Sequence, residues 1–179
     1  CQAENGDIGI VRAAALMHDV DAVQLMAGTN AAKRVDHQHA AAEFADQVLR
    51  AEGWDKMRIA AVQHAIRTHR FREREEAPNS LEAKILFDAD KLDAIGAVGV
   101  ARAFLFAGEV GARLHNPDLD AENSRPYSVD DTGYREFRVK LCKIKDRMLT
   151  AQGRKWARER HAFMDNFFKR FLTEYEGKR

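Results

Sequence analysis

The segment Ala13-Ala14-Ala15-Leu16-Met17-His18-Asp19-Val20 is the most informative part of this sequence. It completes a helical pattern that begins near Asp7, so an apolar helix ends on two adjacent polar side chains. Histidine and carboxylate are natural ligands for Mn, Fe, Zn or Co, and neighbours at a helix end can point into one site. A His-Asp pair alone is common by chance, so its meaning depends on the rest of the chain.

Helical periodicity continues through most of the chain, with no convincing alternating strand and no repeat. We therefore predict an all-α fold, a helical bundle. A long helix over 81–107 would form its apolar centre, and Asp36 could cap an earlier helix that stops near Gly53. The other expected helices cover about 56–69 and two closing segments, 137–148 and 156–171.

The length and composition favour one domain over 1–179, because 179 residues with 45% apolar content can build one well-packed core. Residues 108–132 contain glycines and prolines with little periodicity, which predicts a long loop that is functional or disordered. The chain opens on Cys1 rather than methionine. We expect its native N-terminal helical segment to be missing.

The charge distribution excludes some partners. With 29 basic and 28 acidic side chains the net charge is +1, which gives no strong argument for nucleic acid or an acidic membrane. Basic residues gather after Tyr134, where a solvated helix face is favoured over a nucleic-acid surface.

No apolar run approaches the roughly 18 residues of a spanning helix. Two cysteines, Cys1 and Cys142, form no disulfide framework and fit a reduced compartment, so we expect a cytoplasmic protein.

A second informative segment is Asp88-Ala89-Asp90-Lys91-Leu92-Asp93-Ala94-Ile95-Gly96-Ala97. Together with the His18-Asp19 segment, it resembles the two hallmark motifs of the HD-domain superfamily of metal-dependent phosphohydrolases. The resemblance implies an HD-domain helical bundle with His18 and Asp19 as metal ligands. It also implies Asp90 as the final ligand, with Asp88 as the alternative.

Two histidine-containing segments lie between these motifs and resemble ligand segments of small, stand-alone HD hydrolases. The first is Asp36-His37-Gln38-His39, where the spacing of the following alanines favours His37 over His39. The second is His64-Ala65-Ile66-Arg67-Thr68-His69-Arg70-Phe71, where His69 matches the ligand position and His64 could orient a neighbour. The resemblance thus implies His37 and His69 as further ligands, for a second ion beside the first.

The resemblance covers nearly the whole chain, with two departures. HD enzymes use another metal-binding histidine some tens of residues before the His-Asp pair, and this sequence has none before His18. Either that residue lies upstream of Cys1 or the site is incomplete. The second departure is Arg135-Glu136-Phe137, where a histidine beside the phenylalanine is expected.

Phosphate ester hydrolysis needs a nucleophilic water at neutral pH and neutralised phosphoryl oxygens, and a His/Asp-bound metal provides both. Asp19 and Asp93 are the predicted catalytic residues, although Asp93 could instead only stabilise its helix. Lys91 and Arg102 return to nearly the same helical face, so both could meet substrate phosphates. Ion pairing with acidic neighbours is the simpler alternative for both.

The function expected from the resemblance is a metal-dependent phosphohydrolase that cleaves a phosphoester or phosphoanhydride by a metal-activated water. Its partner would be a small phosphorylated molecule, with nucleotides favoured. The alternative is a degenerate HD module that binds a nucleotide or a protein without turnover. The cofactor would be one or two divalent ions among Mn, Fe, Mg, Zn, Co and Ni, and the ligand types do not choose between them.

Overall fold

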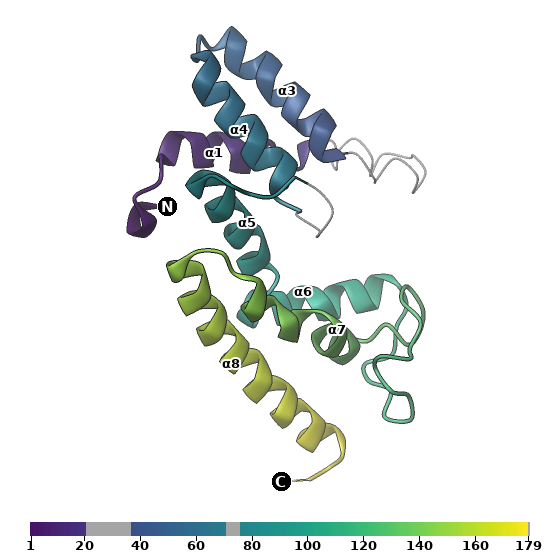
Figure 1. Ribbon diagram of the computed structural model, residues 1–179. Coiled ribbons are helices and arrows are strands. Elements are labelled where there is room, and N and C mark those ends of the chain that lie inside the picture. The colour runs from purple at the N-terminus through teal and green to yellow at the C-terminus, as the bar shows by residue number, and fades with distance from the viewer. Residues whose placement is uncertain (21–36, 71–75, 179) are drawn as a thin grey trace. The chain divides into compact units, whose positions relative to one another are not determined.

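The computed structural model describes residues 1–20, 37–70 and 76–178, and every regular element within them is a helix (Figure 1). The predicted all-α fold is confirmed. The chain divides into two compact units, Cys1–Asp90 and Lys91–Arg179, each with its own hydrophobic cluster. The single domain over 1–179 stays a prediction. Within the described ranges, no helix combines the length and apolar character needed to cross a membrane.

The first unit packs three helices closely through small side chains. Helix α1 (Ile8–Met17), α3 (His37–Ala51) and α4 (Lys56–Thr68) meet one another, and a fourth, α5 (Leu81–Asp93), begins in this unit. Alanines make the close approach possible, because their small methyl side chains let two helix backbones lie near each other. The fully buried alanines of this core are Ala14, Ala41, Ala45, Ala65 and Ala83.

Two aspartates set where helices of this unit begin. The Asp7 side chain accepts hydrogen bonds from the backbone N–H groups of Gly9 and Ile10, and that of Asp55 accepts one from Arg58. Such caps satisfy N–H groups that the first turn leaves without helical partners. Helix α1 ends at Met17, so His18 and Asp19 follow it directly. Asp36, the predicted cap of the next helix, lies outside the described residues.

The predicted continuous helix over 81–107 is wrong, because the chain turns between α5 and α6 (Gly96–Glu109). Gly96 has φ +83°, a backbone conformation that a side chain would strain. A Cβ atom on Gly99 would lie 2.2 Å from the Ala94 carbonyl oxygen. The two glycines therefore permit a tight turn, and the sequence pattern does not reveal it because a glycine is also tolerated inside a helix.

The second unit contains α6, α7 (Gly133–Val139), the 3-10 helix η3 (Leu141–Arg147) and α8 (Ala151–Tyr175). The predicted single helix over 137–148 is wrong, since the backbone leaves helical geometry at Lys140 (φ −135°, ψ −59°) and continues as a 3-10 helix. Phe168 of α8 is 1% exposed and its ring stacks on that of Phe137 at 4.5 Å. Phe168 therefore belongs to the hydrophobic core of this unit.

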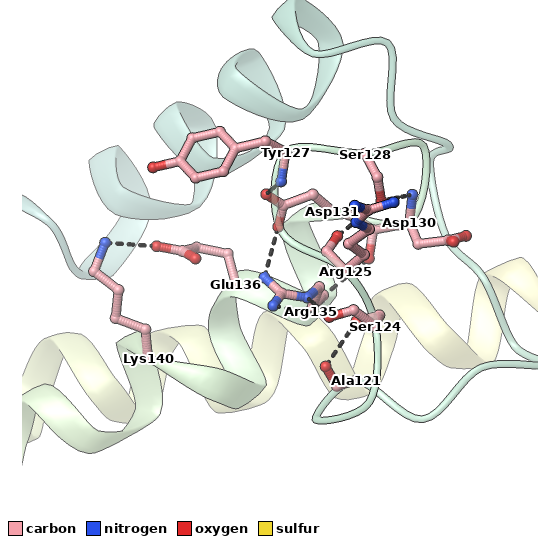
Figure 2. A network of polar contacts seen from close by, with 11 residues as sticks. Ala121, Ser124, Arg125, Tyr127, Ser128, Asp130, Asp131, Arg135, Glu136 and Lys140 are labelled. Carbon is pink, nitrogen blue, oxygen red and sulfur yellow. Dashed lines mark hydrogen bonds and ion pairs between the residues drawn. The ribbon is translucent and has the colours of Figure 1, made fainter. Parts of the chain in front are cut away.

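A buried polar network holds the segment between α6 and α7 (Figure 2). Arg135 of α7 donates from Nη1 to Asp131 Oδ1 at 2.7 Å, and from Nε and Nη2 to the Ser124 carbonyl oxygen at 3.2 and 3.1 Å. Asp131 Oδ2 accepts the Tyr127 backbone N–H at 2.7 Å. The side chains of Arg135 and Asp131 are only 11% and 6% exposed. This segment corresponds to the predicted loop and is anchored to α7 from within.

Candidate metal centre

His18 and Asp19 lie together where α1 ends. The Nδ1 atom of His18 is 2.8 Å from the Ala15 carbonyl oxygen, a distance at which Nδ1–H donates and the Nε2 lone pair stays available. That Nε2 atom is 3.4 Å from Asp19 Oδ2. The side chains of His18 and Asp19 are 20% and 48% exposed, so the pair remains accessible to solvent.

His69 reaches the same carboxylate from the end of α4. Its Nδ1 atom is 2.6 Å from the Ile66 carbonyl oxygen, and its Nε2 atom is 3.8 Å from Asp19 Oδ1. The imidazole rings of His18 and His69 are 5.0 Å apart. In both histidines, a backbone carbonyl three residues earlier fixes the ring and directs Nε2 toward Asp19.

Burial lowers the pKa of His69 to about 4. The Ile66 carbonyl and the charges of Asp90 and Asp19 oppose this shift, and His18 adds to it. His69 is therefore neutral at pH 7, which is the form of imidazole that binds a metal ion.

His18, Asp19 and His69 form a group that could hold a metal ion. Each offers one ligand atom, and the three atoms lie within 4.8 Å of one another. Atoms bound to a common ion lie about 3–4 Å apart when metal–ligand bonds are about 2 Å. The two imidazoles and one carboxylate thus need only a small inward movement, and the donor set fits a divalent ion.

His37 faces this group from the first turn of α3. Its Nε2 atom is 3.6 Å from Asp19 Oδ1, its ring is 5.6 Å from that of His69, and its side chain is 4% exposed. His39 is exposed instead. The geometry supports His37 rather than His39 as the residue that belongs to the site.

Asp90 acts on the same group electrostatically, since its charge raises the pKa of His69 against the larger effect of burial. Asp88, the alternative ligand, is only 2% exposed. The ligand roles of His18, Asp19, His37, His69 and Asp90 stay predictions. The three histidines of this set lie around the Asp19 carboxylate.

His64 serves a different purpose. Its Nδ1 atom is 2.7 Å from Glu76 Oε1, and its Nε2 atom accepts the Asn79 backbone N–H at 3.2 Å. Arg67 also binds Glu76 through Nε at 2.8 Å, and this hydrogen bond and that of His64 lower the pKa of Glu76 to about 2. With both ring nitrogens engaged, His64 connects α4 to the segment that precedes α5.

The predicted substrate and acid–base residues beyond Asp90 belong to the second unit. There Arg102 donates a hydrogen bond to the Asp93 carboxylate, and the two side chains are 59% and 65% exposed. This is the ion pair expected as the simpler alternative for Arg102. Lys91 lies in α5 and Arg102 in α6, so the shared helical face expected for these two residues is wrong. The roles of Lys91, Asp93 and Arg102 in catalysis or substrate binding stay predictions.

Sequence reasoning did not single out Arg70 as a site residue. It follows His69 directly, is exposed, and its Nη1 atom is 3.5 Å from His37 Nδ1. The available signal was its position beside a predicted ligand, although cations are common at helix C-termini for other reasons.

Comparisons with known proteins place the chain in a family. The HD domain profile matches residues 1–95. YpgQ of Bacillus subtilis (strain 168) is 36% identical over 98% of this chain and 77% of its own length. Its crystal structure superposes with a TM-score of 0.70 at 35% identity, over 97% of this chain and 79% of YpgQ.

Two further solved structures extend the comparison. An HD-superfamily hydrolase from Bacillus thuringiensis gives a TM-score of 0.74 at 27% identity, over 99% of this chain and 79% of the other. A crystal structure of YpgQ in complex with ADP gives 0.70 at 34% identity, over 97% and 80% of the two chains. The profile match and the relatives agree with the two hallmark segments and the His18–Asp19–His69 group, and this chain therefore belongs to the HD domain family.

Proposed function

We propose that this chain is a metal-dependent phosphohydrolase that cleaves a phosphoester or phosphoanhydride bond, with a nucleotide as the substrate. The observation that carries the proposal is the convergence of three imidazole Nε2 atoms on the Asp19 carboxylate, at 3.4–3.8 Å. Family membership and the HD-superfamily hydrolase among the similar structures support hydrolysis. The complex of YpgQ with ADP supports a nucleotide ligand.

The residues present fit a divalent ion. We assign His18, Asp19 and His69 to one ion with Asp90 as a further ligand, and His37 to the same ion or to a second one. A divalent ion bound there supplies a hydroxide nucleophile at neutral pH and neutralises charge on phosphoryl oxygens. The chain's own contribution begins with orientation, because the Ala15 and Ile66 carbonyl oxygens hold two of the rings through Nδ1.

Asp19 has two oxygens, and each faces different histidines. Oδ2 is nearest His18, whereas Oδ1 lies 3.6 Å from His37 and 3.8 Å from His69. A carboxylate that is 48% exposed also remains within reach of solvent water, so it can hold a proton taken from that water. Asp19 is therefore assigned both a ligand and an acid–base role, and Asp93 is kept as the second acid–base candidate.

The experiment that tests the proposal is a screen of nucleotides and sugar phosphates for released phosphate or pyrophosphate. The protein is supplied separately with Mn, Fe, Mg, Zn, Co and Ni, and with a chelator as the metal-free reference. We expect turnover only with metal, and none in His18→Ala or Asp19→Ala. His39→Ala, an exposed histidine of α3, is the matched control.

Two results would contradict the proposal. Full activity in His18→Ala or Asp19→Ala would remove the assigned centre. Tight nucleotide binding without release of phosphate or pyrophosphate under any metal would instead support the alternative of an HD module that binds without turnover.

A further inference from the structure

We infer that Arg70 binds a phosphate group of the substrate beside the metal centre. This inference rests on the proposed function and adds a specific phosphate contact to it. Arg70 directly follows His69, its side chain is exposed, and its Nη1 atom is 3.5 Å from His37 Nδ1. The guanidinium group thus lies against the histidines of the site while remaining open to solvent.

Three other arginines of the first unit are committed to carboxylates. Arg50 pairs with Asp46 at 2.6 Å, Arg58 with Asp7 at 3.2 Å, and Arg67 with Glu76 at 2.8 Å. Among the carboxylates that the structure describes, none lies within ion-pair distance of Arg70. Its charge is therefore available for an anionic ligand, in contrast to the charges of those three arginines.

The electrostatics of the site favour an anion at this position. Asp19 and Asp90 together balance the charge of one divalent ion, so Arg70 adds a positive charge next to a cation site. Two cations held a few ångströms apart repel each other, and an anion bound between them is attracted to both. The dipole of α4 also favours a cation after its last turn, but it does not require contact with His37.

The hydrogen-bonding capacity of Arg70 points the same way. A guanidinium has five N–H donors in a planar fork, and the His37 contact uses only one. The remaining donors can form a bidentate pair with two phosphate oxygens, the arrangement in which arginine exceeds lysine. If His37 binds metal through Nε2, its Nδ1 carries the proton and no longer accepts from Arg70, so that the whole fork becomes free for phosphate.

Inorganic phosphate is the probe that tests this inference, because any phosphohydrolase site must accommodate a phosphate group whatever the rest of the substrate is. Calorimetric titration of the metal-loaded protein with phosphate compares wild type, Arg70→Gln and Arg70→Lys. Loss of charge-assisted hydrogen bonds predicts a phosphate Kd about 10- to 100-fold weaker in Arg70→Gln. Arg70→Lys should recover part of this loss, since it keeps the charge but not the fork.

Arg50→Gln is the matched control, because it removes an exposed arginine of the same unit that is paired with Asp46. Metal content and thermal unfolding are measured for every variant, and Arg70→Gln should match wild type in both. Loss of metal in Arg70→Gln would show that Arg70 acts through His37, and would overturn the inference.

Failure of the inference can be distinguished from failure of the proposed function. If wild type binds phosphate and hydrolyses a phosphorylated substrate, but Arg70→Gln binds phosphate equally well, only the inference is wrong. If metal-loaded wild type neither binds phosphate nor turns over any phosphorylated compound, the proposed function is wrong and the inference falls with it.

Discussion

The two units of the chain use buried polar side chains in opposite ways. In the second unit, Asp131 and Arg135 are almost fully buried and satisfy each other, and their remaining hydrogen bonds go to backbone groups within the same loop and helix (Figure 2). In the first unit, His37 and His69 are equally buried but turn their Nε2 atoms toward the half-exposed carboxylate of Asp19.

This difference separates polar groups that stabilise the fold from polar groups arranged for a ligand. A buried pair with good geometry holds a segment in place, and breaking it leaves an uncompensated charge. In the first unit, backbone carbonyl groups fix the Nδ1 atoms of two imidazoles, and the Nε2 atoms converge on a carboxylate. This arrangement is a donor set for a cation. Substitutions in the two units should therefore affect different measurements.

The largest expected effect is on turnover in the first unit. His69→Ala should abolish metal-dependent hydrolysis, because it removes a buried neutral imidazole from the group that could hold the ion. Initial rates of phosphate release measure this loss, with His161→Ala in the second unit as the histidine control. Equal loss of activity in both variants would remove the distinction between the units.

The next effect is on stability in the second unit. Asp131→Ala should lower the free energy of unfolding by about 3–5 kcal/mol, the usual result of leaving one partner of a buried ion pair alone. Urea denaturation measures the change, and metal content should stay at the wild-type level. A variant as stable as wild type would mean that the Arg135 network does not hold the loop.

A smaller effect concerns how the stability of the metal-free protein depends on pH. The pKa of His69 is about 4 in the folded chain, against an ordinary value of 6.5. Above pH 6.5 the ring is neutral whether folded or unfolded. As the pH falls toward 4 the unfolded chain takes up the proton first, so folding loses about 2–3 kcal/mol. His69→Gln should lose less stability between pH 7 and pH 4.5, and an identical loss in both proteins would contradict this assignment.

The smallest effect distinguishes His64 of α4 from His69, which follows this helix. His64→Ala removes contacts to Glu76 and the Asn79 backbone, so we expect a stability loss of about 1–2 kcal/mol with metal content unchanged. Chemical denaturation and metal analysis of the same sample test both parts. Depletion of metal in His64→Ala would place this residue in the centre rather than beside it.

The sequence was informative where chemistry resides in residue type and spacing. The apolar pattern before His18 predicted that His18 and Asp19 lie at the end of a helix, and the helical periodicity predicted the all-α fold. Spacing did not predict that His69 lies with His18 and Asp19, because only the packing of α1 against α4 brings these distant residues together. The resemblance to small HD hydrolases implies instead that His69 binds a second ion.

Two other features could not be predicted because they depend on the path of the backbone in space. The turn between α5 and α6 depends on the positive φ of Gly96, and a glycine inside an apolar pattern is equally compatible with an uninterrupted helix. The contact of Arg70 with His37 depends on where the ends of α3 and α4 meet, so an arginine after a helix carried no distinct signal.

Metal stoichiometry tests the central claim most directly. Wild type and a His18→Ala/His69→Ala double variant are loaded with Mn, separated from free ions by gel filtration and analysed by plasma mass spectrometry. Circular dichroism and unfolding curves confirm that both proteins are folded. The account predicts at least one tightly bound ion per wild-type chain and none in the double variant. Equal metal content in the two folded proteins would contradict it.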